Sequence, residues 1–194
     1  MSRAKARRYS RKPMQGVNIE FKARMGDEKR VRAALKGLRP RVAGRDHQID
    51  TYFQIPSGRL KLRQGNIENA LIFYQRQNMA QVRPSRVLLC EFSDPSQTRM
   101  LKKVLASALG IAAVVDKVRE IYYVGNIKIH LDRVRGLGKF LEVEAFVGKG
   151  SLRRGRKQAD EIKELFGVLP EDILAHSYSD LILERHASRR KRRG

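Results

Sequence analysis

The sequence predicts an α+β protein in which about eight strands, mostly antiparallel, form one curled sheet with helices on its outside. The strand segments alternate apolar and polar residues, as half-buried strands do. Nearly every one has an apolar face and a charged face, and segments with helical spacing follow the first and the fifth strand. A sheet that curls with its charged face inward forms a barrel with a polar lumen, jacketed by helices.

The strands succeed one another at short intervals and are separated by turn residues such as Gly, Pro and Asn. We expect them at residues 17–25, 47–55, 59–63, 70–77, 87–92 and 114–124, and in the two arms of a hairpin within 126–147. The basic stretch 39–45 contains a glycine, and we expect it to form a loop.

Helical spacing of apolar residues appears in three further places. The first helix opens at Gly26 and Asp27 and ends before Pro40, because the residue before a proline disfavours helical backbone. The second helix follows Asp94 and ends at Leu109. Its apolar stripe comprises Met100, Leu101, Val104, Leu105 and Ala108. The third helix lies beyond residue 150, and short helices over 169–184 close the domain. The inner side of the third helix comprises Ile162, Leu165 and Phe166.

The last hairpin gathers ionisable residues on one face. Its first arm places Lys128, His130 and Asp132 on the same side, and its second arm does so with Glu142 and Glu144. Two carboxylates at i and i+2 lie only ~7 Å apart on a strand, close enough to share a divalent cation. A solvated face of a one-sided sheet would show the same alternation, so the hairpin alone leaves both interpretations open.

Positive charge is concentrated at the two ends of the chain. The formal net charge is +22, and residues 1–12 and 185–194 each hold six Lys or Arg and no acid. We therefore expect a basic disordered tail over 1–16, one domain over 17–184 and a second basic tail over 185–194. Such tails attract nucleic acid, polyphosphate or anionic membrane surfaces without sequence information.

The single cysteine, Cys90, cannot form an internal disulfide. It lies in an apolar segment, so we expect a buried structural thiol in a reducing compartment.

No run approaches the ~18 apolar residues that cross a bilayer, and the N-terminal segment lacks the apolar run of a secretory signal. We expect a soluble cytoplasmic protein, and the sequence carries no signal for its oligomeric state.

The face shared by Arg59, Lys61 and Arg63 shows why the environment of these charges matters. Neighbours ~7 Å apart repel by roughly 0.6 kcal/mol in water and by roughly 2.4 kcal/mol at an effective dielectric near 20. The full set of same-face cations is Lys22, Arg24, Arg59, Lys61, Arg63, Arg76, Lys117, Arg119 and Lys128. The same-face carboxylates are Glu20, Asp50, Asp132, Glu142 and Glu144. A lumen with surplus positive charge and a separate acidic cluster suits a polyphosphate chelated to Mg²⁺.

These residues fall into short motifs. They are NxExK at 18–22, QIDTYF at 48–53, GRLKLR at 58–63, IFYQR at 72–76, KVR at 117–119, HLD at 130–132, LGKFLEVE at 137–144 and SYSDL at 177–181. With them the chain resembles the CYTH family, the triphosphate tunnel metalloenzymes, and most closely its class IV adenylyl cyclase-like branch. The motifs occur in family order, and the resemblance covers residues 17–184 and omits both tails.

The resemblance implies a closed antiparallel β-tunnel in which Glu20, Glu142 and Glu144 bind Mg²⁺ or Mn²⁺. The phosphates of a nucleoside triphosphate or an inorganic polyphosphate would be held by Lys22, Arg59, Lys61, Arg63, Arg76, Lys117 and Arg119. Catalytic roles would fall to Lys22 and to Asp132, which would lie near the reacting end. The implied activity is conversion of ATP to cyclic AMP and pyrophosphate, or hydrolysis of a triphosphate.

Asn18 departs from the family pattern, which has a glutamate at this position. An amide can still offer its carbonyl oxygen to Mg²⁺, but the site loses one negative charge. A non-catalytic protein that binds nucleotide, polyphosphate or RNA is therefore the alternative interpretation, and the basic tails favour it.

Overall fold

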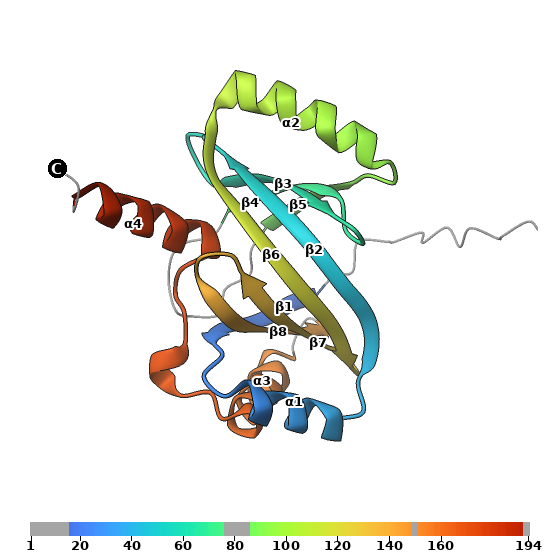
Figure 1. The fold of residues 1–194 in the computed structure, drawn as a ribbon. Coiled ribbons are helices and arrows are strands. Elements are labelled where there is room, and N and C mark those ends of the chain that lie inside the picture. The colour runs from blue at the N-terminus through green and yellow to red at the C-terminus, as the bar shows by residue number, and fades with distance from the viewer. Residues whose placement is uncertain (1–15, 76–85, 149–150, 192–194) are drawn as a thin grey trace, which may run out of the picture.

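The structure is a computed structural model and describes residues 16–75, 86–148 and 151–191. In these parts of the chain, eight strands form one antiparallel sheet in the order β1-β8-β7-β6-β2-β3-β4-β5 (Figure 1). The strands are β1 Gly16–Arg24, β2 Arg41–Phe53, β3 Arg59–Gly65, β4 Ala70–Gln75, β5 Arg86–Glu91, β6 Ile111–Val124, β7 Ile127–Val134 and β8 Gly138–Gly148. The helices are α1 Glu28–Gly37, α2 Pro95–Leu109, α3 Leu152–Phe166, the 3-10 turn Pro170–Asp172 and α4 Tyr178–Lys191.

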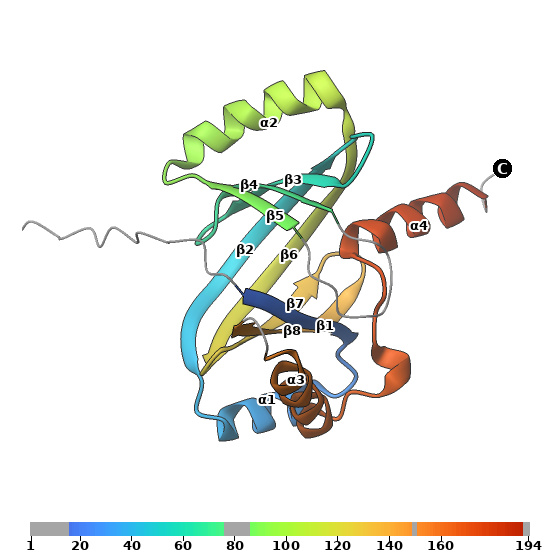
Figure 2. The same ribbon diagram turned by 180° about the vertical axis from the view of Figure 1, so that it is seen from behind.

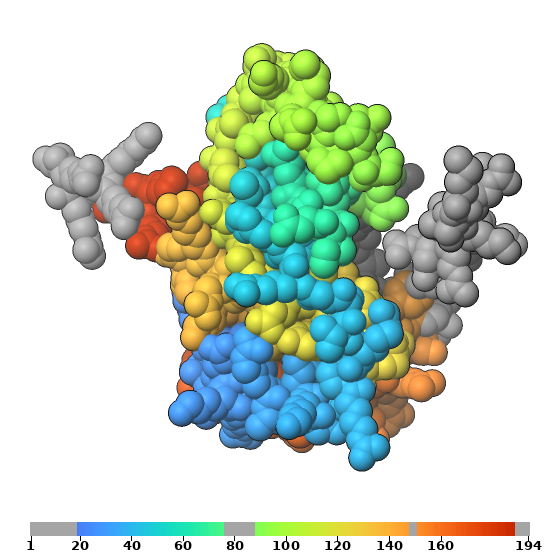
Figure 3. Space-filling view, turned by 45° about the vertical axis from the view of Figure 1, so that its right-hand side comes forward, coloured from blue at the N-terminus to red at the C-terminus, as the bar shows by residue number. Residues whose placement is uncertain are grey.

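The sheet curls into a half-barrel with α1, α2 and α3 on its outside, and α4 extends from one side (Figures 1 and 2). The two longest strands, β2 and β6, pair with each other and run through the whole sheet. Strands β7, β8 and β1 extend from β6 on one side, where α1 and α3 cover the outer surface. Strands β3, β4 and β5 extend from β2 on the other side, and α2 lies at that end of the molecule (Figure 3).

The main hydrophobic core lies between the outer face of β1, β8 and β7 and the two helices α1 and α3. Its fully buried members include Ile19, Ile129, Leu141 and Val143. A second, smaller core lies on the inner face at one end and includes Tyr52, Val115, Val134, Phe140 and Tyr178. The start of α4 therefore packs against the inner face at that end of the half-barrel. Polar residues line the rest of the inner face.

The closed tunnel that the sequence analysis expected is not confirmed. Strand β1 pairs with β8, and β5 pairs with β4, but no ladder joins β1 to β5 among the described residues. The free edge of β1 instead pairs with the segment that precedes α4, through a bridge between Ala23 and Ile173 and a hydrogen bond from Leu174 N to Lys22 O of 2.8 Å. The described sheet is a curled sheet that stays open between its two ends.

Two further predictions about the elements are wrong. The stretch 39–45 is not a loop, because β2 begins at Arg41. A β-bulge between Val42 and Gly44, where Gly44 has φ of 138°, breaks the alternation on which strand prediction depends. Cys90 is exposed rather than buried, because β5 is an edge strand of the described sheet.

The apolar stripe of α2 is largely uncovered. Met100 and Val104 are 62% and 56% exposed, and Thr98 is the buried residue of this helix. In α3 the prediction holds for Ile162 and Phe166, whereas Leu165 is 42% exposed.

Helix α4 runs to Lys191 and so passes the boundary at residue 184 that the sequence analysis set. Residues 185–191 are thus helical, and the predicted tail over 1–16 lies outside the described residues except for its last position. Within the described ranges, no helix combines the length and apolar character needed to cross a membrane.

Gly155 allows α3 to approach the sheet closely, which gives a stability prediction. A Cβ atom at this position would lie 2.6 Å from Ile19 Cδ1 and 2.9 Å from Val147 Cγ1. We expect Gly155→Ala to destabilise the fold by about 1–2 kcal/mol, because overpacking of a tight core outweighs the gain in helix propensity.

Gly37 is the matched control, since it is also helical and a Cβ there meets nothing within 4 Å. Gly37→Ala should stabilise the protein by about 0.5–1 kcal/mol. Urea denaturation of both variants measures the change in the free energy of unfolding. If the two variants changed it in the same direction, α3 would not approach the sheet as closely as described.

Candidate functional site

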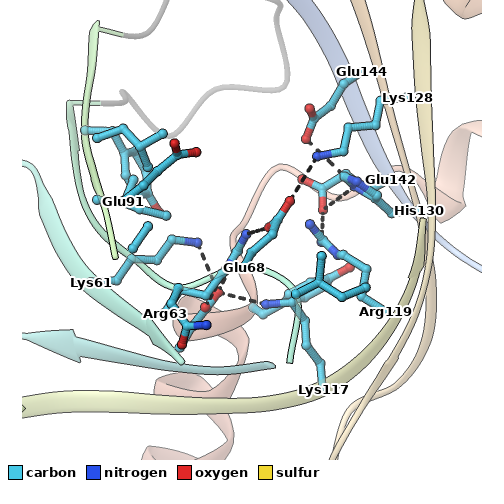
Figure 4. A pocket seen from close by; sticks show the side chains of 18 of the residues that line it. Lys61, Arg63, Glu68, Glu91, Lys117, Arg119, Lys128, His130, Glu142 and Glu144 are labelled. Atoms are coloured by element: carbon cyan, nitrogen blue, oxygen red, sulfur yellow. Dashed lines mark hydrogen bonds and ion pairs between the residues drawn. The ribbon is translucent and has the colours of Figure 1, made fainter. Parts of the chain in front are cut away.

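A cavity of about 810 Å³ opens on the concave face of the sheet, and all eight strands contribute to its lining (Figure 4). Antiparallel pairing carries the polar positions of each strand to the same face, so the alternation in the sequence becomes one charged surface. The described cationic residues of the lining are Lys22, Lys61, Arg63, Lys117, Arg119 and Lys128. The acidic ones are Glu20, Asp50, Glu68, Glu91, Glu142 and Glu144. The surplus of positive charge expected in the lumen is therefore not found among the described lining residues.

Asp50 is the centre of the cationic part of the cavity. Its carboxylate accepts hydrogen bonds from Lys61 Nζ at 3.0 Å, from Arg63 Nε at 2.8 Å and from Lys117 Nζ at 2.7 Å. Burial alone would raise the pKa of Asp50, but the charges of Lys117, Lys61 and Arg63 hold that pKa well below its usual range. Burial lowers the pKa of Lys117 to about 7 despite the attraction of Asp50. One carboxylate thus holds three cations in place on β3 and β6.

Arg119 forms a second buried group with Asp132. Its Nε and Nη2 atoms donate to the two oxygens of Asp132 at 2.7 and 2.6 Å, and Tyr178 donates its hydroxyl to the same carboxylate at 2.8 Å. Arg119 Nη2 also contacts Glu142, which lines the cavity. Asp132 lies behind Arg119 and outside the described lining, so its contact with Arg119 directs the guanidinium toward the cavity.

Lys22 and Arg119 converge on Glu142 from two sides. Lys22 Nζ lies 2.9 Å from Glu142 Oε1 and 4.2 Å from the centre of the Tyr178 ring. Burial favours the neutral acid, but Lys22 and Arg119 keep the pKa of Glu142 well below its ordinary value. Glu142 is therefore ionised over the physiological pH range.

An acidic cluster lies on β1, β8 and β7, at the other side of the cavity. In the sheet register, Glu144 on β8 lies directly opposite Glu20 on β1 and Lys128 on β7. Burial and the charge of Glu142 raise the pKa of Glu144. Ligand atoms of Glu142, Glu144 and His130 lie within 4.8 Å of one another.

This cluster fits a divalent cation for a physical reason. Glu142 and Glu144 are half-buried and their negative charges lie close together, so a metal ion would relieve their repulsion. Neither ring nitrogen of His130 has a hydrogen-bond partner among the described residues, although both are buried. His130, which the sequence analysis did not select, thus lies with two of the expected metal ligands.

Glu68 is a cavity residue that the sequence analysis missed. It accepts from Arg63 Nη1 at 2.7 Å and lies 3.4 Å from Lys128 Nζ, and these two cations lower its pKa to about 2 although burial opposes the shift. Buried Asp46 holds the Glu68 segment by accepting its backbone N–H at 3.2 Å and that of Ile67 at 2.9 Å. A single acid in a turn between two strands has no periodic pattern, so no signal in the sequence identified it.

The structure places the predicted site residues in three groups. Those that line the cavity are Lys22, Lys61, Arg63, Lys117, Arg119, Glu20, Glu142 and Glu144. Arg59 and Asp132 are not among the described lining residues: Arg59 Nη2 donates to both carboxylate oxygens of Asp180 at 2.9 and 2.8 Å, beside the start of α4. Arg76 and the side chain of Asn18 lie outside the described part of the chain.

Comparison with known proteins gives a family and several relatives. A family model described as the CYTH domain matches residues 17–178. A Methanocaldococcus jannaschii protein, provisionally named an adenylate cyclase, is 25% identical over 178 residues, which cover 85% of this chain and 98% of the relative.

Solved structures share the fold. A Pyrococcus horikoshii protein has a TM-score of 0.72 at 26% identity, with 84% of this chain and 98% of that chain covered. A Vibrio parahaemolyticus protein, provisionally named an adenylate cyclase, has a TM-score of 0.71 at 19% identity, with 87% and 99% covered. A Hippeastrum protein, provisionally named an adenylyl cyclase and described as having a dominant triphosphatase activity, has a TM-score of 0.59 at 16% identity, with 88% and 96% covered.

Proposed function

The chain belongs to the CYTH domain family, and from this premise we propose that it is a metal-dependent enzyme that cleaves the phosphate chain of a nucleoside triphosphate in its cavity. The observation that carries the proposal is the division of the cavity into a cationic part around Asp50 and an acidic cluster at Glu142 and Glu144. Cations bind phosphate oxygens, and carboxylates bind the metal ion that accompanies them.

The balance of charge in the described lining supports the need for a metal ion. A triphosphate carries several negative charges, and six acidic residues already face the six cations of the lining. A polyanion that enters alone would gain little electrostatic energy there. We propose that Glu142, Glu144 and Glu20 hold Mg²⁺ or Mn²⁺, which would act as a Lewis acid on the phosphoryl oxygens.

The residues of the chain would bind and orient the phosphate chain. Lys61, Arg63 and Lys117 would exchange part of their contact with Asp50 for phosphate oxygens. Arg119, fixed by Asp132, would contribute a rigid pair of donors, and Asp132 thus acts as a positioning residue.

The wall of the cavity on β4 and β5 favours a nucleotide over inorganic triphosphate. Ile72, Tyr74 and Leu89 line the cavity there, and aromatic and apolar side chains suit the face of a nucleobase. The two candidate reactions differ in the phosphorus that is attacked: a cyclase directs the 3′-hydroxyl to the α-phosphorus, and a triphosphatase directs water to the terminal phosphorus.

Incubation with ATP, GTP, tripolyphosphate and thiamine triphosphate tests the proposal. Each is supplied with Mg²⁺ or Mn²⁺, and the products are identified by mass. Cyclic nucleotide with pyrophosphate identifies a cyclase, and released phosphate identifies a triphosphatase. EDTA should abolish either product, and turnover that persists in EDTA would contradict the metal dependence.

A non-catalytic binding protein is the second candidate, because the cations around Asp50 are already paired and the family glutamate is replaced by Asn18. Binding of ATP without any product would support it. Contact of the basic segments 1–16 and 185–194 with nucleic acid stays a prediction.

The pKa of Lys117 predicts a pH dependence of triphosphate binding. Because burial lowers the pKa of Lys117 to about 7, the side chain is charged below pH 7 and increasingly neutral above it. A bound polyanion favours the charged form, so binding above pH 7 takes up a proton. We expect triphosphate affinity to fall by up to about tenfold per pH unit above pH 7.

Calorimetry at several pH values, in buffers of different ionisation enthalpy, measures both the affinity and the proton uptake. Lys117→Arg is the matched control, because arginine stays charged and the dependence should flatten. Equal pH profiles for the two proteins would show that Lys117 does not titrate on binding.

A further inference from the structure

His130 is buried, and neither nitrogen of its ring makes a hydrogen bond with the described residues. The residue is 1% exposed, and neither Nδ1 nor Nε2 has a hydrogen-bond partner in the described parts of the chain. Leaving a buried donor or acceptor unpaired costs about 1–3 kcal/mol. A histidine with a purely structural role would normally donate one ring N–H to a nearby acceptor, so the position of His130 requires another explanation.

The surroundings of His130 supply that explanation. His130 lies on β7 directly opposite Glu142 on β8. Its Nδ1 atom is 3.9 Å from Glu142 Oε2 and 3.9 Å from Glu144 Oε1, which is too long for a hydrogen bond. Donor atoms that share a cation at about 2.0–2.2 Å lie about 3–4 Å apart, so these distances match those between ligands of one ion.

We propose that His130 is a ligand of the metal ion, together with Glu142 and Glu144, and that this nitrogen donor makes the site prefer Mn²⁺ or a similar first-row transition ion over Mg²⁺. The proposal rests on the proposed function only in requiring a divalent cation at the acidic cluster. Mg²⁺ favours oxygen ligands, whereas imidazole suits first-row transition ions, and among these Mn²⁺ is the one that also suits the two carboxylates.

The neighbouring cations are compatible with this assignment. Arg119 contacts Glu142 Oε2 and Lys22 contacts Glu142 Oε1, but each carboxylate oxygen has two lone pairs and can bind a metal ion as well. A neutral imidazole adds a ligand without adding charge. The carboxylates at Glu142 and Glu144 would therefore still supply the charge that attracts the ion.

Metal titrations of the full chain without nucleotide test the proposal. Calorimetry with Mn²⁺ and with Mg²⁺ is compared for the wild type, His130→Phe and His130→Gln. We expect His130→Phe to lower Mn²⁺ affinity by about 10- to 100-fold and Mg²⁺ affinity by about threefold or less. His130→Gln replaces the nitrogen by an amide oxygen and should keep Mg²⁺ binding while Mn²⁺ binding falls.

His47→Gln is the matched control, because His47 is exposed and pairs with Asp116 away from the cavity. It should change neither affinity. Circular dichroism shows whether the His130 variants fold. Pulsed EPR of the Mn²⁺-loaded wild type does not depend on any variant, and it should detect coupling of the ion to a ¹⁴N nucleus.

Absence of ¹⁴N coupling, or an equal loss of Mn²⁺ and Mg²⁺ affinity in folded His130→Phe, would overturn the assignment of His130. Those outcomes leave the proposed function standing if the wild type still turns over a triphosphate with metal. Failure of turnover with every metal and substrate would contradict the proposed function, while ¹⁴N coupling would still support His130 as a ligand.

Discussion

Asp50→Asn should destabilise the folded protein by about 3–5 kcal/mol, because it removes the buried carboxylate that Lys61, Arg63 and Lys117 share. Lys61 and Arg63 would then repel each other across a neutral amide, and Lys117 would lose its proton more readily, because the charge of Asp50 no longer opposes the effect of burial on its pKa. Guanidinium denaturation measures the loss of unfolding free energy. Tripolyphosphate should raise the melting temperature of this variant more than that of the wild type, since an added anion replaces the missing charge.

Asp160→Asn is the control for this prediction. Asp160 pairs with Lys163 at 2.9 Å on the surface of α3, and its side chain is 65% exposed. An exposed pair of this kind contributes about 0–1 kcal/mol. If the Asp50 and Asp160 variants lost similar stability, Asp50 could not be the group that holds the cationic side of the cavity together.

Glu144→Gln should reduce metal-dependent turnover by on the order of 100-fold or more, because it removes one charged ligand from the proposed metal site. The fold should be unaffected or slightly more stable, since burial and the charge of Glu142 already raise the pKa of Glu144. Turnover at saturating metal and a thermal melt without metal measure the two effects.

Glu142→Gln should cause a similar loss of turnover but should also destabilise the protein. Its carboxylate pairs with Lys22 and Arg119, which hold its pKa well below the usual value, so the amide takes a charged partner from half-buried Lys22 and leaves Arg119 with Asp132 alone. Near-wild-type turnover in both glutamate variants would exclude the acidic cluster as a metal site. Equal melting temperatures would contradict the difference between the two carboxylates.

Much of this architecture could be predicted from local patterns. The period of two in the strands placed Glu20 and Lys22, Lys117 and Arg119, and Glu142 and Glu144 on polar faces. Antiparallel pairing in the observed registers then brings those faces together, because residues directly opposite each other point to the same side of the sheet. The helices α1 and α2 follow capping residues, since Asp27 and Asp94 accept backbone N–H groups at their first turns.

The partner of each charge was decided by the tertiary structure. From the sequence alone, the carboxylate of Asp50 could bind a metal ion or face the solvent. The registers of β2 with β3 and β6 place it among three basic side chains instead. Asp132 lies behind Arg119 and also accepts a hydrogen bond from Tyr178 of α4, contacts that only the fold creates, and its place near the reacting end stays a prediction.

The sequence by itself determined which residues share the polar face of each strand, because side-chain alternation is a property of a single strand. The tertiary structure decided that the described sheet stays open between β1 and β5, that Glu68 enters from a turn, and that His130 lies unpaired beside two glutamates. These features depend on contacts between residues far apart in the chain. Their energies are set by burial and by distances of a few ångströms, which no local pattern encodes.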